Sequence, residues 1–256
     1  MTTRTTLPYA GIAARAVGVS CALALALTAC GADDPAPTGS SGSTPTTASS
    51  QTTTPTTVGD PVRDAIIAAM QGQSQTIVEL ASNEETTLRE LPASALKGWK
   101  VLELTLATPP HPRRAMIGLA DDGRAVILMS QPANFATVAE GASVTSADQA
   151  VELAQTYIES TGNLAQPSYA VASIDEVRFL PRPNADQADL IAKTKKEQAS
   201  AVTPPNATKD GTGWTVVTWW VSAGQLVKHE MSIAGDGSVK DAPTVVVDRL
   251  PVPISP

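Results

Sequence analysis

The chain has 256 residues and a formal net charge of −7 at pH 7, from 18 basic and 25 acidic side chains. An acidic surface repels the phosphate backbone, and no basic-aromatic patch offsets it, so nucleic acid is not an expected partner. The two histidines and two cysteines form no zinc-type spacing, and neither a metal nor another cofactor is expected.

Residues 1–29 have the organisation of an export signal. Two arginines and no acid precede an apolar run of about 14 residues, which is shorter than the ~20 residues that a membrane-spanning helix needs. The motif Leu27-Thr28-Ala29-Cys30 at the end of this run resembles the lipobox of bacterial lipoproteins. The resemblance implies cleavage before Cys30 and a diacylglyceryl group on its thiol as the membrane contact. It also implies a location on the extracytoplasmic face of the cell membrane.

Residues 30–57 are predicted to form a disordered tether behind the lipidated cysteine. From residue 33 onward this segment consists of Thr, Ser, Pro, Gly, Ala and Asp with a single Gln, and it cannot bury enough apolar surface to fold. A flexible coil of this length spans roughly 25–30 Å on average. Because Cys21 lies in the leader, we expect no internal disulfide, and the folded part must be stabilised by its core alone.

The folded part is expected to begin with a helix, with Asp60 as its N-cap, Pro61 at the first helical position and an end near Gly72. The segment 100–106 then alternates leucines with other residues, as a strand with one buried face does. Asp122-Gly123 follows between two apolar runs, which indicates a hairpin turn.

A second helix is predicted from the capping-box pattern that starts at Ser146, with Gly162 closing it as the C′ residue. The segment 174–180 is predicted to be a strand. Residues 182–212 are interpreted as an insertion that holds a charged helix over roughly 186–199. This insertion is expected to be either a mobile loop with some helical content or a binding lid.

The chain contains an imperfect internal repeat. A Gly-Trp pair opens each of two similar stretches, at Trp99 and Trp214, and a methionine follows each Trp after the same 17 positions. The turns Asp122-Gly123 and Asp236-Gly237 come next in each stretch. A last strand is predicted over 244–247, before a proline-broken tail.

These patterns predict an α+β fold of two tandem repeats, over residues 58–142 and 143–256, that form either one domain or two. Each repeat is expected to pack one amphipathic helix on a curved antiparallel sheet. This order of elements resembles the PepSY-like and cystatin-like modules of envelope proteins, which implies binding or inhibition rather than catalysis. The composition, rich in alanine and threonine, resembles that of actinobacterial proteins.

Candidate catalytic residues are few. His111 lies in a proline-rich turn without a recognisable nucleophile, and His229 lies on the apolar face of its strand, where a core or edge role is favoured. Asp121-Asp122-Gly123 lacks the alternating acids of a calcium loop and is interpreted as a turn. No nucleophile elbow or phosphate-binding loop is present in the sequence, and we do not predict an enzyme.

Trp219 and Trp220 are the most suggestive aromatic residues. Neighbours in a strand point to opposite faces of the sheet, so at least one indole could be partly exposed and form a binding surface. The alternative is that the helix covers one face and the other repeat covers the second face. Both interpretations are open at the level of sequence.

The favoured function is a non-catalytic binding or regulatory module for a protein, a peptide or another envelope component. One alternative is an accessory subunit whose edge strand joins a membrane complex. A second is a carrier of a small ligand or lipid, or a hydrolase, that uses a cleft between the repeats. A deep apolar cleft with converging polar groups would favour this last class.

Overall fold

The computed structural model describes residues 60–108 and 112–253. The leader, the lipobox with Cys30, the tether and His111 lie outside the described residues. Within them the chain forms an α+β fold with five α-helices and two antiparallel sheets. The predicted α+β class with antiparallel sheets is therefore confirmed.

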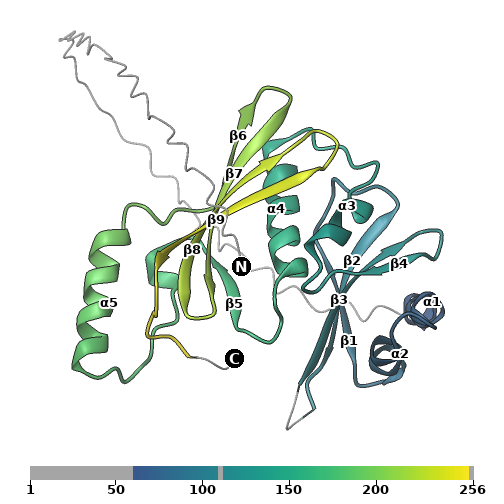
Figure 1. Cartoon of the computed structure of the whole chain (residues 1–256), viewed down its shortest axis with the longest axis horizontal. Helices are drawn as coiled ribbons and strands as arrows, with labels where there is room; N and C mark the ends of the chain where they lie inside the picture. Colours follow the sequence, from purple (N-terminus) through teal and green to yellow (C-terminus); the bar gives the residue numbers. More distant parts are fainter. Residues whose placement is uncertain (1–59, 109–111, 254–256) are drawn as a thin grey trace, which may run out of the picture. The chain divides into compact units, whose positions relative to one another are not determined.

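The first sheet is an antiparallel meander in the order β1-β2-β3-β4 (Figure 1). Its strands are β1 (Thr87–Leu91), β2 (Trp99–Leu106), β3 (Arg113–Ala120) and β4 (Ala125–Ile127). The register places Leu102 opposite Ile117 and Leu104 opposite Ala115. These four side chains pack with the apolar residues of α1 (Asp60–Met70) and α2 (Gln75–Ser82), which cover one face of the sheet.

The opposite face of the first sheet is also buried, which the alternation within 100–106 did not indicate. Trp99, Val101 and Met116 pack there against two further helices, α3 (Phe135–Val138), which follows the 3-10 turn η1 (Pro132–Asn134), and α4 (Ala147–Thr161). Gly118 allows this close packing, because a Cβ atom at that position would lie 2.4 Å from Val138 Cγ2.

The second sheet has the order β5-β7-β8-β9, with β6 also paired to β7. Its strands are β5 (Ser168–Val171), β6 (Asn206–Asp210), β7 (Gly213–Ser222), β8 (Gln225–Ile233) and β9 (Val239–Val247). Both β5 and β6 pair with the same edge of β7, at opposite ends of that strand.

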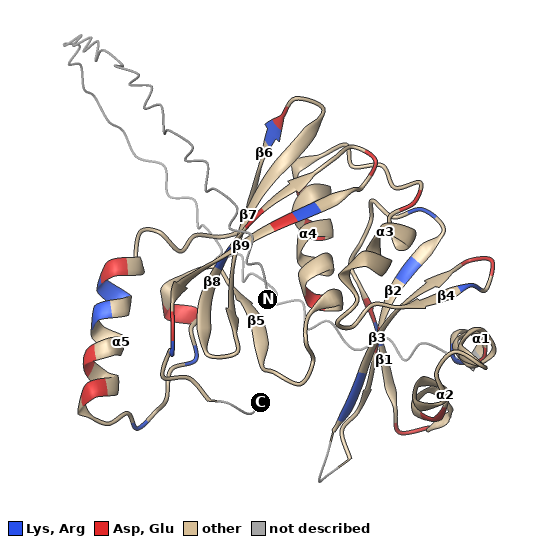
Figure 2. Cartoon of the chain, in the orientation of Figure 1, with Lys and Arg blue, Asp and Glu red and all other residues tan. Residues whose placement is uncertain are grey.

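The chain leaves the sheet between β5 and β6. This excursion contains the 3-10 turn η2 (Ile174–Glu176) and α5 (Ala185–Gln198), which carries both acidic and basic side chains (Figure 2). The predicted insertion at 182–212 therefore includes one sheet strand, β6. Side chains of the excursion, among them Ile174 and Val202, pack with Trp219 on the face of the second sheet that α4 does not cover.

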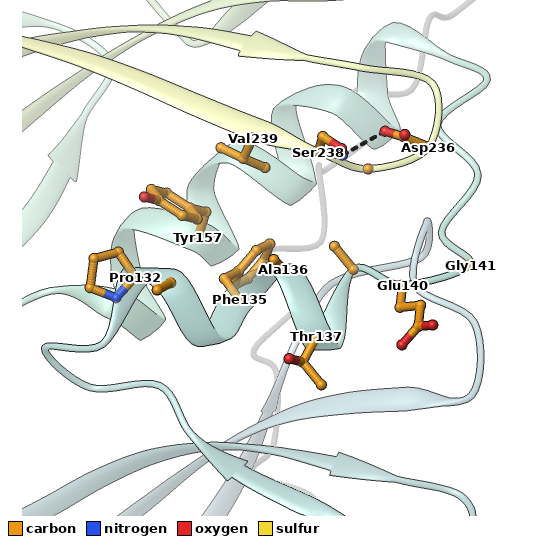
Figure 3. Close-up of a pocket in the computed structure, with 13 residues that line it drawn as sticks. Pro132, Phe135, Ala136, Thr137, Glu140, Gly141, Tyr157, Asp236, Ser238 and Val239 are labelled. Atoms are coloured by element: carbon orange, nitrogen blue, oxygen red, sulfur yellow. Dashed lines mark hydrogen bonds between the residues drawn. The ribbon is translucent and has the colours of Figure 1, made fainter.

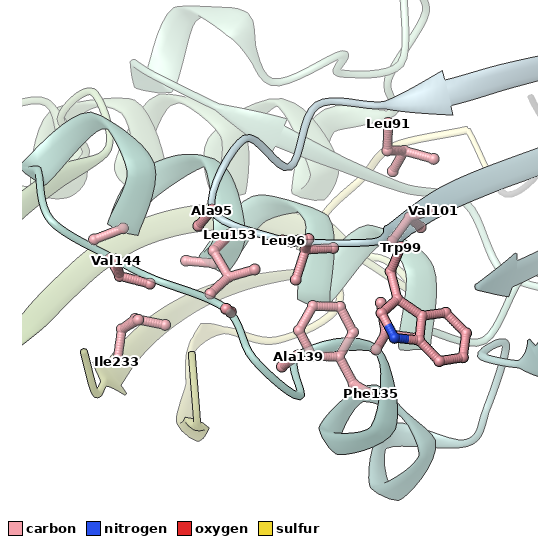
Figure 4. Packing of buried hydrophobic residues seen from close by; sticks show 14 of the residues in the cluster. Leu91, Ala95, Leu96, Trp99, Val101, Phe135, Ala139, Val144, Leu153 and Ile233 are labelled. Carbon is pink, nitrogen blue, oxygen red and sulfur yellow. The ribbon is translucent and has the colours of Figure 1, made fainter. Parts of the chain in front are cut away.

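One apolar cluster joins the two sheets. Leu153 of α4 lies in it together with Trp99 of the first sheet and Ile233 of the second (Figure 4). Two backbone hydrogen bonds reinforce this packing, from Ser143 N to Ala95 O and from Val144 N to Gly235 O, each 3.0 Å long. The described residues thus share a core that neither sheet could form alone.

Several predicted elements are confirmed. α1 begins at Asp60, the segment 100–106 lies within β2, and α4 and α5 cover the predicted helical segments. The Asp-Gly turns are present as well, with φ of +86° at Gly123 and +84° at Gly237.

Two local predictions are wrong. Residues 174–180 form a 3-10 turn and an irregular segment rather than a strand, because their apolar side chains pack under the second sheet without alternating. Gly162 ends α4 as predicted, but as its C-cap, with an extended backbone at φ −66°, rather than as the C′ residue one position further on. The Ser146 hydroxyl does cap α4, accepting a 3.2 Å hydrogen bond from Gln149 N. The Gln149 side chain, however, accepts from Thr145 N, so the capping box is incomplete.

Candidate ligand-binding cleft

A cleft of ≈ 840 Å³ opens where α2, β3 and the loop that leads from α4 into β5 come together. We call it the main chamber. Its apolar lining is formed by Ile77, Leu80, Pro112, Ala115, Met129, Leu164, Ala165, Pro167, Val252 and Pro253. Its polar lining is formed by Thr76, Arg113, Arg114, Ser130, Asn163, Gln166, Ser168, Tyr169 and Arg178. The chamber therefore combines an apolar floor with polar groups from several separate segments.

A smaller hollow of ≈ 220 Å³ continues the main chamber. We call it the side arm, and the two together the junction cleft. The two hollows share lining residues, among them Arg114, Leu164 and Tyr169. The side arm adds Glu159 of α4 and Trp220 of β7 to the lining.

The backbone around the main chamber explains how its wall is placed. Ile77 and Leu80 belong to the buried face of α2, and Ala115 is their neighbour on β3. Ser130 has a φ of 56°, and its N–H donates to the carbonyls of Thr161 and Gly162 at the end of α4. This left-handed residue turns the chain after β4 and holds the α4 terminus beside the chamber.

The three arginines of the main chamber differ in their partners. Arg114 binds Glu103 through its guanidinium. Arg113 donates to Thr76 O at 3.2 Å and lies 3.8 Å from the carboxylate of Glu79. Arg178 has no ion-pair partner among the described residues.

Tyr169 holds Arg178 in place at the edge of the main chamber. The Arg178 guanidinium carbon lies 4.6 Å from the centroid of the Tyr169 ring, and Arg178 N donates to the Tyr169 hydroxyl at 2.9 Å. A guanidinium stacked on an aromatic ring keeps its N–H groups free in the plane for an anion.

Behind the side arm lies an ion network that joins the first sheet to α4. Glu103 binds both Arg114 and Arg89, and Arg89 also binds Glu159 of α4. Burial by itself would raise the pKa of Glu103, but the hydrogen bonds from Arg114 and Arg89 outweigh it and hold that pKa below its usual value. Glu103 is therefore a permanent anion at neutral pH.

The structure separates the two tryptophans that the sequence suggested as a binding surface. Each is only 4 % exposed, so neither forms an exposed contact surface, and that interpretation is corrected. Trp219 packs under the excursion between β5 and β6, while Trp220 borders the side arm. The indole N–H groups of both are buried and have no hydrogen-bond partner among the described residues.

His229 has the core or edge role that its pattern favours. It is 9 % exposed, and its Nδ1 lies 2.8 Å from Asp241 Oδ2 on β9. Thr218 is opposite it on β7, with a buried hydroxyl that has no partner among the described residues. Burial raises the pKa of nearby Tyr157, and the charge of Asp241 adds to the effect. The imidazole lines neither the main chamber nor the side arm.

A separate hollow of ≈ 740 Å³ lies between α3, α4 and the β8–β9 turn (Figure 3). Phe135 and Tyr157, which meet edge to face at 5.1 Å between ring centroids, line it together with Val239. Its charged residues are Glu140 and Asp236, and Asp236 is engaged in its own turn through Ser238 N at 3.0 Å, which lowers the pKa of its carboxyl. The junction cleft is larger and carries the cations.

Sequence reasoning singled out Trp220 of the side arm and missed the other residues of the junction cleft. Arg113 and Arg114 were visible only as part of a proline-rich turn, and Arg178 was placed in a strand that does not form. The available signal was the pair of consecutive arginines at the start of a strand in an acidic chain. The loop 163–168 carries no recognisable motif. It lines the cleft because α4 ends just before it.

The remaining candidates are turns or surface groups. Asp122 accepts a hydrogen bond from Arg124 N at 3.0 Å, as expected for a turn. Among residues 60–108 and 112–253, no group of three or more His, Cys, Asp or Glu side chains could hold a metal ion. The helices described there include none that is long and apolar enough to cross a membrane.

Comparisons with known proteins find no counterpart. No protein-family model matches the chain, and neither a curated protein nor a solved structure matches it. The function is therefore argued from the geometry of the cleft and from the sequence.

Proposed function

We propose that this chain is a membrane-anchored, non-catalytic lipoprotein that binds a small envelope component in the junction cleft. The observation that carries the proposal is the main chamber, with a volume of ≈ 840 Å³, an apolar floor and polar groups from α2, β3 and the loop before β5. A concave, mostly apolar site with a few placed polar groups is what small-molecule binding requires.

The anchor in this proposal is a diacylglyceryl group on Cys30. Its support is the lipobox resemblance, together with the predicted export signal before it and the tether of residues 30–57 behind it. A tether of this composition would let the folded part move some tens of Å from the membrane while remaining attached to it. Such a protein would collect or hold its ligand at the extracytoplasmic face.

Binding is favoured over catalysis by the surroundings of the titratable groups. His229 is paired with Asp241 and buried away from the cleft, and Glu103 is neutralised by two arginines. Neither group meets the main chamber as an acid or a base with access to a bound molecule.

We also infer that the two halves of the chain are tandem repeats. In each half a helix precedes an antiparallel sheet, and a turn with a glycine of positive φ joins the last two strands, at Gly123 between β3 and β4 and at Gly237 between β8 and β9. The junction cleft then lies between the repeats, with α2 and β3 from 58–142 and the loop 163–168 from 143–256. Its position favours a carrier over a surface that binds protein.

The test is to block the main chamber with a large side chain and to measure which small molecule remains bound during purification. Ala165 is exposed and lines the chamber, so Ala165→Trp should block it without disturbing the core, whereas Ala192→Trp adds the same side chain on the exposed face of α5. The wild type and Ala192→Trp, purified with their native envelope lipids, should release the same small molecule on extraction for mass spectrometry. Ala165→Trp should release none, and equal release from all three proteins would contradict the proposal.

A second candidate function, an accessory subunit that pairs through an edge strand, is favoured by β9. No strand among the described residues pairs with its outer edge, and Val245 and Val246 are 50 % and 36 % exposed. An open edge of this kind can accept a strand from a partner. Val245→Lys should then abolish co-purification of a stoichiometric envelope protein, and unchanged co-purification would count against this function.

A further inference from the structure

We infer that the ligand of the junction cleft is an anionic amphiphile, a molecule with one carboxylate or phosphate group on an apolar body. This inference rests on the proposed function and names the chemistry that the cleft selects. It follows from the charge of the lining, from one arginine that has no ion-pair partner among the described residues, and from the apolar part of the lining.

The charge of the main chamber is opposite to that of the chain. Its lining contains Arg113, Arg114 and Arg178 and no aspartate or glutamate, although acidic residues outnumber basic ones by 25 to 18 in the sequence. A concave wall of one sign focuses the local field and favours a ligand of the opposite charge. Within the main chamber a cationic ligand would face three guanidinium groups and no carboxylate of the lining, because Glu159 lines only the side arm and Glu79 and Glu103 lie outside both hollows.

Arg178 is the group that would bind the anion directly. It lines the chamber, it has no ion-pair partner among the described residues, and its guanidinium carbon lies 4.6 Å from the centroid of the Tyr169 ring. Arg113 would assist, because its contact with the exposed Glu79 at 3.8 Å is long and solvent-screened. Arg114 is held by Glu103 and contributes a positive wall rather than a free donor. A planar fork of N–H donors matches both carboxylate and phosphate oxygens.

The apolar wall would accept the rest of the ligand. Ile77 and Leu80 of α2, Met129 after β4, and Leu164 with Val252 form apolar parts of the chamber lining. None of these side chains offers a hydrogen bond to a sugar or a peptide backbone. A chain or ring of hydrocarbon buried there would leave its charged end at the arginines, which is the arrangement that an amphiphile has at an interface.

The experiment compares probes that share one apolar chain and differ only in the head group. Dansyl-labelled undecanoate, its primary amide and dansyl-labelled undecyl phosphate are titrated into the chain from residue 30 onward, with Cys30→Ser to prevent disulfide-linked dimers. We expect the carboxylate or the phosphate to bind about tenfold more tightly than the amide, as loss of a charge-assisted hydrogen bond predicts. The ratio between the two anions identifies the preferred head group.

The variants locate the binding. Arg178→Gln should weaken binding of the anionic probes about tenfold and leave the amide unchanged, while Arg178→Lys should restore part of the difference. Arg182→Gln removes an exposed arginine that does not line the cleft and should have no effect. Ala165→Trp should abolish binding of every probe.

The outcomes separate this inference from the function on which it rests. If the amide binds as tightly as the anions, the cleft binds apolar molecules without charge selection, so the inference is wrong and the proposed function stands. If no probe binds the wild type, or if Ala165→Trp binds all probes as the wild type does, both are wrong. Equal losses for anions and amide in Arg178→Gln would assign Arg178 a structural role and overturn the inference.

Discussion

At the scale of single residues, Glu103 shows how a charge can be kept inside a sheet. Its side chain is 8 % exposed, and arginines from both neighbouring strands meet it, Arg89 on β1 and Arg114 on β3. The arginines remain 49 % and 40 % exposed, so they bring charge to the carboxylate while keeping part of their own hydration. The cost of burying one anion is thereby offset at little further desolvation.

Glu103→Gln is therefore expected to lower the free energy of unfolding by about 1–3 kcal/mol at neutral pH. Because the pKa of Glu103 is lowered in the folded state, its contribution is present above the ordinary value of 4.5 and is lost as the pH falls through the folded-state pKa. Urea denaturation at neutral pH and at about pH 3 should show the difference between the wild type and the variant shrink in acid.

A matched control uses a carboxylate on the neighbouring strand. Glu90 is 51 % exposed and lies 3.7 Å from Lys100, so Glu90→Gln should change the stability by less than about 0.5 kcal/mol. If both substitutions lower the free energy of unfolding by the same amount at neutral pH, the Glu103 network contributes no more to stability than an ordinary surface ion pair.

At the scale of elements, the β7–β8 hairpin contains a turn whose sequence is not the best for its geometry. Ser222 pairs with Gln225, and the two residues between them have positive φ, 51° at Ala223 and 74° at Gly224. This is the pattern of a type I′ turn, which favours Asn-Gly. A left-handed alanine costs more than a left-handed asparagine, because the amide side chain tolerates that region.

Ala223→Asn should therefore raise the free energy of unfolding by about 0.5–1 kcal/mol, as measured by urea denaturation. Ala192→Asn, on the exposed face of α5, introduces the same side chain into a right-handed helix and should instead destabilise slightly. A loss of stability in Ala223→Asn would contradict the turn geometry.

The contact between β3 and α3 depends on Gly118. Its φ is not positive, so the requirement for glycine is one of space, with a Cβ atom falling 2.4 Å from Val138 Cγ2. Gly118→Ala should lower the free energy of unfolding by about 1–3 kcal/mol because the core is already filled. Val138→Ala in the same chain should recover part of this loss, and strictly additive costs would show that the two positions do not compete for space.

At the scale of the whole folded part, the two sheets share one core through α4. The predicted amphipathic stripe of α4 accounts for one buried face, yet Ala150, Leu153 and Ala154 lie in a cluster that contains side chains of both sheets. Neither sheet can therefore lose this helix without exposing its own apolar face.

Leu153→Ala tests that sharing. Leu153 is fully buried, so the substitution should lower the free energy of unfolding by about 2–5 kcal/mol. The unfolding transition should remain single and cooperative. The protection of backbone amides against hydrogen exchange should fall equally in β2 and β8. If β2 kept its protection while β8 lost it, the sheets would be separate folding units and the shared core would not couple them.

The sequence by itself determined the local elements and much of their character. Capping residues and apolar periodicity located α1 and α4, and alternation located β2, because these signals depend on neighbours along the chain. The Asp-Gly turns could be identified for the same reason. The export signal and the lipidation of Cys30 remain predictions from sequence.

Only the tertiary structure decided which faces are covered and where a ligand could bind. Trp219 and Trp220 point to opposite faces, as their adjacency requires, but their burial depends on α4 and on the excursion before β6. The junction cleft joins Arg113 to Arg178, which are far apart in sequence and have no shared pattern. Such a site arises from packing between elements, and packing leaves no period in the amino-acid sequence.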